Sequence, residues 1–349
     1  MAHQDHLHFG HTPDGVLQNG VIQRMHTLGR DLSKRNSATD MRMHSPGGDC
    51  ILGIDLGATF LRIARVDAAG GEFFSIATPS SSEAEEVLSS AVRKVSREQQ
   101  ICCVGLSRAP GLDEHGHVAE WPSRPDWAQL PLIPWLRRAA NAPVVSADDG
   151  VCAVVSEHRL RGDVAGRAVT ACISIGTGLA VGIVDGNRVL PTGDGASTLS
   201  HERFGSLDFP CRCGRRGCLQ TGLSVQGLEK IMAAGKILDL QIAFEEFLGV
   251  LKSRYNVDTV IVTGGGVVRF GTQFLLQNLV NSKCDALTLR ISNAPEFSGI
   301  GGALLLATEH AARNKDVRNE FWERRVVGVL EREAGKQTSS LSFAQAVTS

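Results

Sequence analysis

Short apolar runs recur along the chain from residue 51 to residue 291, each bounded by polar or glycine-containing segments. Runs of about four to eight residues with such boundaries are typical of buried β-strands. The pattern predicts strands at residues 51–55, 61–66, 73–77, 101–106, 144–147, 168–175, 179–184, 258–262 and 287–291.

Apolar residues at helical spacing predict helices between many of these strands. One begins near Ser82, where Glu85 follows as in a capping box. Others are predicted at residues 151–159, 227–234 and 237–255, and one opens at Gly299. In the longest, one apolar face is formed by Leu240, Phe244, Phe247, Leu248 and Leu251. Strands alternating with helices in a chain rich in alanine, glycine and valine indicate an α/β fold.

Composition limits the class of protein. The chain has 349 residues, 42% of them hydrophobic, enough for about two domains of ~150 residues each. Its 36 basic and 37 acidic residues give a net charge of −1, so we expect no nucleic-acid or membrane partner. No apolar run reaches the ~20 residues of a membrane span, and the N-terminus lacks a signal-peptide pattern. These features predict a cytoplasmic protein.

The first 48 residues differ from the rest of the chain. They hold six of its eleven histidines, at positions 3, 6, 8, 11, 26 and 44. A histidine-rich tract can bind metal, but none of these residues has a cysteine or carboxylate partner at a recognisable ligand spacing. We therefore expect a solvated, disordered extension at residues 1–48, and a frayed tail at residues 331–349.

One histidine and three cysteines follow the pattern His201-x9-Cys211-x-Cys213-x4-Cys218. An imidazole and three thiolates are the ligand set of a closed, tetrahedral zinc site. The alternatives are unrelated free cysteines or a disulfide, and a disulfide is disfavoured in a chain without export signals. Because four protein ligands leave no open position for water, we expect a structural rather than a catalytic Zn²⁺.

Two pairs of predicted strands are joined by short turns that suit phosphate binding. Asp55, Gly57, Ala58 and Thr59 belong to the first turn, and residues 176–178 form the second. Small residues leave room for phosphate oxygens beside backbone N–H groups, and Asp55 offers an oxygen to Mg²⁺. Either hairpin alone is a common structure. Two hairpins of the same design in two halves of one chain are a much more specific indication of phosphate binding.

The strand at residues 144–147 runs into Asp148 and Asp149, and a helix containing Glu157 follows. A carboxylate at such a strand end can act as a general base toward a hydroxyl, or it can simply cap the helix. Two adjacent carboxylates can also raise one another's pKa.

Together, the hairpins, the Asp pair and the Cys-x-Cys-Gly-x-x-Gly-Cys-Leu segment resemble the ROK family (repressors, open reading frames and sugar kinases). The resemblance covers residues 51–312. It implies two ribonuclease-H-like lobes around a nucleotide cleft, with a zinc knuckle, and ATP and Mg²⁺ as cofactors. The expected lobes are residues 49–160, with 298–330 packing back on them, and residues 161–297.

The resemblance also assigns roles. It makes Asp149 the catalytic base and assigns phosphate binding to Asp55, Gly57, Ala58, Thr59, Gly176, Thr177 and Gly178. The adenosine motif falls on Gly264, Gly265 and Gly266, where glycines let the backbone approach a ligand, although a flexible turn is the alternative. The chain departs from the family at Ala58, where glycine is usual, and at Phe60, where a polar residue is usual.

The family's sugar-contacting positions fall on Gly111, Ser123, Asp148, Thr198, His201 and Gln220. Three of them depart from the family pattern, because Asp148 replaces Asn and both Thr198 and Gln220 replace Glu. A buried polar group left unpaired costs ~1–3 kcal/mol, so changed donors and acceptors imply a changed hydroxyl pattern. A C7 cyclitol with a hydroxymethyl arm is therefore an alternative to glucose.

The leading hypothesis is a kinase that transfers phosphate from ATP to a hydroxyl, expected to be primary, of a sugar or cyclitol. The alternative is a catalytically weak sugar-binding sensor or regulatory protein, favoured by Phe60, Ala58 and the altered sugar contacts. Retention of Asp149 and both hairpins argues against it. A structural metal-binding protein would explain the zinc motif but not the hairpins. A homodimer is expected from the family resemblance alone.

Overall fold

The computed structural model describes residues 49–97, 99–160, 168–186, 188–193, 198–279, 287–314 and 322–333. The predicted extension at residues 1–48 lies outside this part of the chain, as do residues 334–349. Within the described ranges, no helix is both long and apolar enough to cross a membrane.

The first half of the described chain builds a five-stranded sheet in the order β3-β2-β1-β4-β7. β1 pairs antiparallel with β2 and parallel with β4, and β7 extends the parallel part. β1 and β4 are buried over nearly their whole length, which explains their continuous apolar runs. The strands are β1 (Asp49–Leu56), β2 (Phe60–Asp67), β3 (Gly71–Ala77), β4 (Gln100–Arg108) and β7 (Val144–Asp148).

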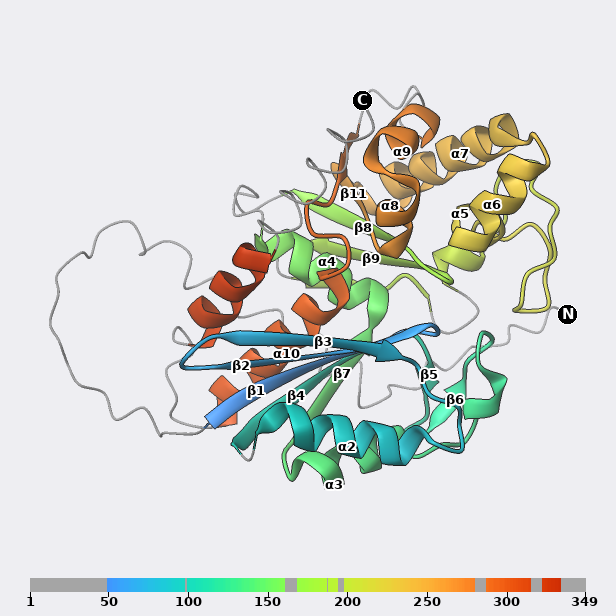
Figure 1. Ribbon diagram of the computed structural model, residues 1–349. Coiled ribbons are helices and arrows are strands. Elements are labelled where there is room, and N and C mark those ends of the chain that lie inside the picture. The colour runs from blue at the N-terminus through green and yellow to red at the C-terminus, as the bar shows by residue number, and fades with distance from the viewer. Residues whose placement is uncertain are drawn as a thin grey trace, which may run out of the picture.

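A second five-stranded sheet repeats this topology in the order β10-β9-β8-β11-β12 (Figure 1). Here β8 pairs antiparallel with β9 and parallel with β11, and β12 extends the parallel part. The predicted α/β fold is confirmed. The strands are β8 (Val169–Ile175), β9 (Leu179–Asp185), β10 (Arg188–Leu190), β11 (Thr259–Thr263) and β12 (Thr288–Ile291).

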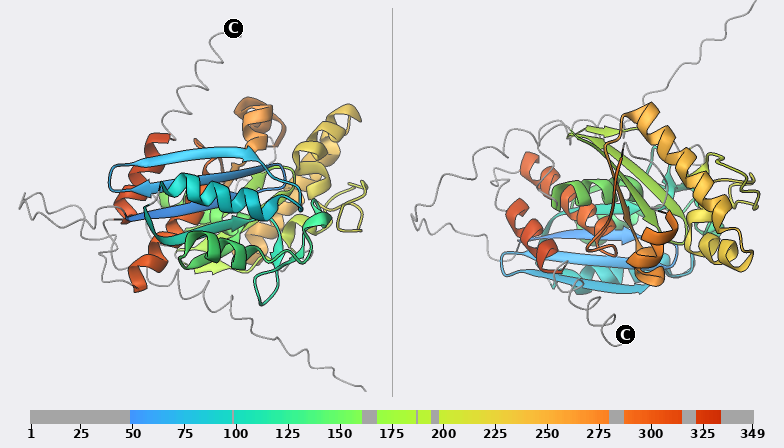
Figure 2. Two further views of the ribbon diagram at one scale, coloured as in Figure 1. Left: turned by 60° about the horizontal axis from the view of Figure 1, so that its bottom comes forward. Right: turned by 90° about the horizontal axis from the view of Figure 1, so that it is seen from above.

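Helices α2 (Ala84–Ser96) and α3 (Leu132–Ala140) share a hydrophobic core with one face of the first sheet (Figures 1 and 2). On the second sheet, α7 (Ile237–Tyr255) buries the apolar face predicted for it, together with residues of β8, β9 and β11. Both outer layers are thus held by the expected amphipathic faces.

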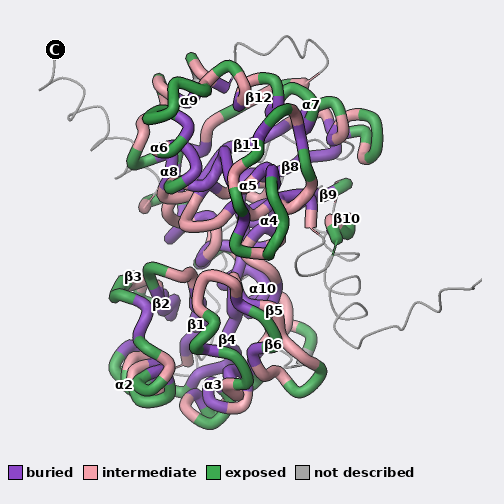
Figure 3. Tube along the Cα trace, turned by 90° about the vertical axis from the view of Figure 1, so that its right-hand side faces the viewer, coloured by how far each residue is buried: buried purple, intermediate pink, exposed green. Residues whose placement is uncertain are grey.

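Two helices lie between the sheets, and each contacts the sheet of the other half (Figure 3). α4 (Asp149–Leu160) follows β7 of the first sheet but lies against β8 and β9. α10 (Ser298–Asn314) follows β12 of the second sheet but lies against β1 and β4. Because α4 and α10 also contact each other, the two halves share one central helical layer.

Glycines make this layer possible. A Cβ added at Gly105 of β4 would lie 1.8 Å from the carbonyl oxygen of Ala303 in α10. In the other half, a Cβ at Gly182 of β9 would lie 2.0 Å from the carbonyl oxygen of Gly150 in α4. Both distances are too short for a real side chain. Each helix therefore packs backbone to backbone on the sheet that it contacts.

A buried carboxylate fastens α4 to the segment that enters α10. Glu157 accepts hydrogen bonds from the hydroxyls of Ser292, at 2.5 Å, and Ser298, at 2.6 Å. The Ser298 hydroxyl also lies 2.6 Å from that of Thr263 at the end of β11. The network therefore joins α4, β11 and the start of α10.

The predicted capping box at Ser82 is wrong. α2 begins at Ala84 with Glu83 as N-cap, and Ser80 Oγ donates to the Glu83 carboxylate at 2.6 Å, outside the helix. A helical segment at residues 322–333 runs into the predicted tail, and its Trp322 and Leu330 are buried with α10. Further short elements are β5 (Gly111–Leu112), β6 (Val118–Glu120), η1 (Pro125–Trp127), η3 (Leu199–His201), α5 (Gln220–Leu223), α6 (Val225–Ala233), α8 (Gly265–Phe270) and α9 (Thr272–Leu279).

Candidate active site

The turns of the two hairpins meet, although they belong to different sheets. The first turn joins β1 to β2 and the second joins β8 to β9. Thr59 Oγ1 and Thr177 Oγ1 lie 2.7 Å apart, within hydrogen-bond distance. The structure therefore brings the two predicted phosphate turns to one place.

The first turn is supported from its own half. Thr78 Oγ1 donates to the carbonyl oxygen of Gly57 at 2.6 Å, and Arg124 donates to that of Ala58 at 3.2 Å. Phe60, which follows the turn, leaves 46% of its surface exposed. The guanidinium of Arg62 lies over its ring, 5.4 Å from the centroid.

Asp55, at the end of β1, contacts polar side chains of β2 and β4 and lies against the start of α10. Its carboxylate accepts a hydrogen bond from Ser107 of β4 at 2.9 Å and pairs with Arg62 of β2 at 3.5 Å. Burial raises the pKa of Asp55, while Arg62 and Ser107 act in the opposite direction. Gly299 of α10 lies so close that an added Cβ would be 2.7 Å from the carboxylate.

Asp148 and Asp149 lie at the junction of β7 and α4, and both carboxylates accept a hydrogen bond from the Gly150 N–H at 2.9 Å. Burial raises the pKa of Asp149 well above its ordinary value of 3.8, and the negative charges of Asp148 and Asp55 raise it further. Burial also raises the pKa of Asp148, against the effect of the Arg108 guanidinium. Three carboxylates thus form one electrostatically coupled group.

Sequence reasoning missed Arg62 and Ser107, which contact Asp55 directly. Arg62 stands opposite Asp55 in the β1–β2 hairpin register, so counting back from the predicted turn would have found it. Ser107 is beside Asp55 only because β4 pairs with β1. No pattern within the sequence indicates that pairing.

The second turn is held from the segment that follows the cysteines. Gly176 N donates to the carbonyl oxygen of Gly178 within the turn, at 2.9 Å. Val225 N, at the start of α6, donates to the carbonyl oxygen of Gly176 at 2.9 Å. The side chain of Gln220 accepts a hydrogen bond from Leu179 N at 3.0 Å.

The three glycines after β11 divide into two kinds. Cβ atoms at Gly264 and Gly266 would lie 2.5 and 2.4 Å from atoms of Ile175, the residue before the second turn. Gly264 also has φ = +92°, which favours glycine. Gly265 faces open space, with no atom within 4 Å of an added Cβ. Packing on β8 therefore explains Gly264 and Gly266 without a ligand, whereas Gly265 leaves its backbone approachable.

The predicted metal ligands converge. One ligand atom from each of His201, Cys211, Cys213 and Cys218 lies within 4.8 Å of the others. A tetrahedral zinc ion with Zn–S near 2.3 Å and Zn–N near 2.0 Å would separate ligand atoms by about 3.5–3.8 Å. Cys213 Sγ lies 3.6 Å from Cys218 Sγ, and Cys211 Sγ lies 3.5 Å from His201 Nδ1. These side chains fit such an ion.

Two members of this Cys/His cluster have pKa shifts that favour the metal-binding form, whereas burial raises the pKa of the Cys211 and Cys218 thiols. Burial lowers the pKa of His201, which favours the neutral imidazole that can bind a metal. Burial raises the pKa of Cys213, but hydrogen bonds from Arg215 outweigh it and bring the pKa to about 7. Gly217 has φ = +72°, and a Cβ there would lie 2.3 Å from the carbonyl oxygen of Leu207, so the turn needs glycine.

The predicted sugar-contacting residues lie in several different parts of the structure. Asp148 adjoins Asp149, and His201 belongs to the Cys/His cluster. Thr198 Oγ1 lies 2.8 Å from Ser200 Oγ. Gly111 pairs with Glu120 in a two-stranded ribbon, while Ser123 is partly exposed between β6 and η1. The negative charge of Glu120 raises the pKa of His201, against the larger effect of burial.

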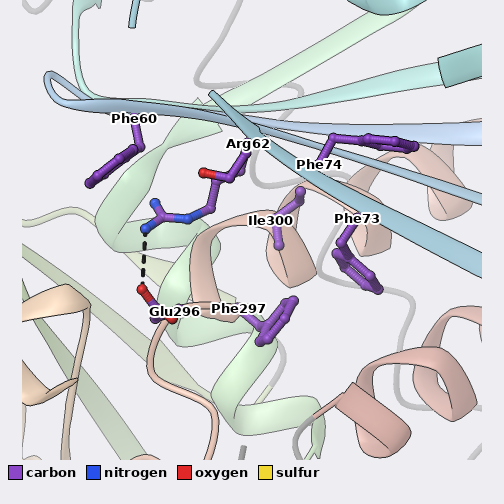
Figure 4. A pocket seen from close by; sticks show the side chains of 8 residues that line it. Phe60, Arg62, Phe73, Phe74, Glu296, Phe297 and Ile300 are labelled. Atoms are coloured by element: carbon purple, nitrogen blue, oxygen red, sulfur yellow. Dashed lines mark ion pairs between the residues drawn. The ribbon is translucent and has the colours of Figure 1, made fainter. Parts of the chain in front are cut away.

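A separate pocket of about 270 Å³ lies beside the first turn (Figure 4). Its walls come from β2, β3 and the start of α10, and Arg62 pairs with Glu296 across it at 3.7 Å. Arg62 thus pairs with Asp55 and also lines this pocket. The lining residues are Phe60, Arg62, Phe73, Phe74, Ser75, Glu296, Phe297 and Ile300.

Comparison with known sequences assigns the chain to a family. The ROK family signature matches residues 51–246, and the chain belongs to the ROK family. It is 29% identical over 181 residues to a glucokinase of Streptomyces coelicolor, covering 51% of this chain and 57% of the relative. It is 33% identical over 178 residues to a kanosamine kinase of Amycolatopsis mediterranei, covering 48% and 57%. The chain therefore spans less than two thirds of the length of these curated relatives.

Solved structures share the fold. The ROK hexokinase of Thermus thermophilus superposes with a TM-score of 0.61 at 22% identity, covering 76% of this chain and 100% of that one. A ROK family glucokinase of Streptomyces griseus, solved with glucose and AMPPNP, gives a TM-score of 0.60 at 22% identity, covering 74% and 99%. At this identity the likeness establishes the fold alone.

Proposed function

We propose that this protein is an ATP-dependent kinase that phosphorylates a hydroxyl group of a sugar or sugar-like cyclitol. The observation that carries the proposal is the 2.7 Å contact between Thr59 and Thr177, which unites the two hairpin turns next to three carboxylates. The two sheets would then form two lobes that clamp the nucleotide from both sides. Membership in a family with kinase relatives for glucose and kanosamine supports this assignment.

The turns would hold the phosphates of ATP. Their backbone N–H groups and the two threonine hydroxyls can donate to phosphate oxygens, so a bound phosphate would replace the contact between the threonines. Gly265 has the open backbone that an adenosine group requires. Mg²⁺, when bound, neutralises charge on the phosphates, and Asp55 is the carboxylate that would hold it.

Asp149 would accept the proton of the attacking hydroxyl. Efficient proton acceptors have a pKa near the working pH, and burial together with two neighbouring charges moves the pKa of Asp149 in that direction. The Gly150 N–H holds its carboxylate at the start of α4. The neighbouring Asp148 would orient the substrate through a second hydroxyl.

The acceptor pocket would differ from one built for glucose. Thr198 and Gln220 stand where the family places Glu, and the side chains of both make hydrogen bonds within the protein. His201, whose Nδ1 faces Cys211, would offer Nε2 to a hydroxyl. A substrate with fewer hydroxyl contacts on this side, such as a C7 cyclitol, would fit these changes, with a primary hydroxyl directed at Asp149.

The test is ADP release from Mg·ATP, comparing wild type with Asp149→Asn. The acceptor panel contains glucose, mannose, N-acetylmannosamine, N-acetylglucosamine, fructose and several C7 cyclitols. Turnover on one acceptor that falls by about 10²–10⁴-fold in the variant would support the kinase and its base. Clear preference for glucose over every cyclitol in a competition assay would exclude the cyclitol proposal.

A sugar-binding sensor is the second candidate, and the exposed Phe60 beside the first turn favours it. An aromatic side chain in place of a polar one could weaken phosphate binding. Sugar binding in a thermal-shift assay, combined with no turnover on any acceptor, would favour the sensor over the kinase.

A further inference from the structure

Gln220 lies between the Cys/His cluster and the second hairpin turn, and its side chain touches both. Its Oε1 accepts a hydrogen bond from Leu179 N at 3.0 Å, and its Nε2 donates to Cys211 Sγ at 3.6 Å. A side-chain amide suits this place, since it has both a donor and an acceptor. A glutamate, as in the family pattern, would lack the donor for the thiolate.

The contact also involves Gly178, the last residue of the turn. An added Cβ at Gly178 would lie 3.0 Å from Gln220 Oε1, so the amide lies directly against the turn. The backbone of the same segment adds the bond from Val225 N to the carbonyl oxygen of Gly176 at 2.9 Å. The middle residue of the turn, Thr177, meets Thr59.

We infer that Gln220 is a positioning residue that couples the Cys/His cluster to nucleotide binding, rather than a residue that contacts the sugar. With its two hydrogen bonds in place, the backbone N–H groups of the turn are pre-arranged for phosphate. A metal ion in the cluster would fix Cys211 and, through it, Gln220. The inference rests on the proposed function, because it assigns phosphate binding to this turn.

The test measures binding of Mg·AMPPNP and of the acceptor sugar separately, by calorimetry on the purified full chain. Gln220→Met keeps the side-chain volume and loses both hydrogen bonds, so nucleotide affinity should fall by about 10- to 30-fold. Sugar affinity should change by less than about twofold. Gln226→Ala is the matched control, because Gln226 is exposed on the same segment and contacts only Arg212 among the described hydrogen bonds.

Chelation of the metal completes a thermodynamic cycle. In wild type, metal removal should weaken nucleotide binding by a similar factor, whereas in Gln220→Met it should add little, because the connection is already broken. Metal content by atomic absorption should be unchanged in the variant. Hydrogen exchange at the Leu179 amide, which needs no ligand, should accelerate in Gln220→Met.

Each other outcome is decisive. Loss of sugar affinity with unchanged nucleotide affinity would make Gln220 a sugar contact and overturn the inference. Unchanged affinity for both ligands, or equal effects of chelation in wild type and variant, would also overturn it. If wild type binds no Mg·AMPPNP at all, the proposed function itself fails. If the nucleotide binds and its affinity does not depend on Gln220, only the inference about Gln220 fails and the proposed function stands.

Discussion

The two hairpins have the same topology but different chemistry. In the first, Asp55 stands opposite Arg62, and further carboxylates from β7 and α4 lie nearby. In the second, the corresponding pair is Ser174 opposite Ala180, with no charge. Duplicated architecture therefore does not imply duplicated function, since one half holds the acid–base groups and the other supplies neutral donors.

The two turns also differ in what supports them. Thr78 and Arg124 of the same half hold the first turn through its carbonyl oxygens. The second turn depends on Gln220 and Val225, in the segment directly after the cysteines. The second turn is thus held by the segment that follows the Cys/His cluster, whereas the first is held by residues of its own half.

The largest effect is expected from a substitution in the carboxylate group of the first half. Asp149→Asn should lower kcat by about 10²–10⁴-fold, because the proton acceptor is lost. The same change should raise the melting temperature at pH 7. Since the pKa of Asp149 is higher in the folded than in the unfolded state, its ionisation destabilises the fold as pH rises above about 3.8.

Activity and calorimetry on one preparation check both effects. A variant that loses activity and also melts earlier would mean that Asp149 is structural. Near pH 3, where the carboxyl is protonated in both states, the difference in melting temperature should disappear.

The second-largest effect is expected from a substitution in the Cys/His cluster, next to the segment that supports the second turn. Cys218→Ser removes a buried ligand, so the zinc content should fall from one equivalent per chain and stability should drop by about 4 kcal/mol or more. Metal analysis and denaturant unfolding provide the measurement. Arg212→Ala, an exposed change in the same loop, serves as the control and should leave both unchanged. Full metal content in Cys218→Ser would contradict the assigned ligand set.

A matched pair of glycine substitutions compares the halves through their packing. Gly105→Ala and Gly182→Ala should each destabilise the protein by about 1–3 kcal/mol or more, because each Cβ would collide with a helix backbone. Gly249→Ala, at an exposed position in α7 with open space around it, should instead stabilise by about 0.5–1 kcal/mol. Denaturant unfolding would reveal unequal packing of the halves if only one of the first two variants were destabilised.

The smallest expected effect tests the difference in charge between the two hairpins. Asp148→Asn removes a negative charge beside Asp149 and so should lower the pKa of Asp149. Because the ionised base is the active form, the acidic limb of the kcat/KM profile should move to lower pH. Ser174→Ala, in the uncharged hairpin, should leave the profile in place. A limb that does not respond to Asp148→Asn would assign it to another group.

Much of this arrangement could be predicted from local patterns. The apolar stripe of α7 and the two hairpins follow from residue spacing and turn chemistry within short segments. The four residues of the Cys/His cluster also lie within eighteen residues of each other, so the motif contained the whole cluster. Arg62 was equally predictable, because hairpin register follows from the position of the turn.

Other features could not be found in this way. Ser107 meets Asp55 through a parallel pairing, and Thr59 meets Thr177 across the two halves. The position of Gln220 matched a sugar contact, and only the structure showed that its side chain accepts a hydrogen bond from Leu179 N beside the second turn. A motif fixes where a residue stands in the chain, but not which neighbour its polar atoms select.

By itself, the sequence determined the α/β class, the positions of most strands and of the longest helix, the residues of the Cys/His cluster and the family. These depend on periodicity and on short-range spacing, which survive without knowledge of the fold. Only the tertiary structure decided that α4 and α10 each pack on the sheet of the other half, that three carboxylates lie close together and that the segment after the cysteines supports the second hairpin turn. Such contacts join residues far apart in the chain, and only close packing of the two halves brings them within hydrogen-bond distance.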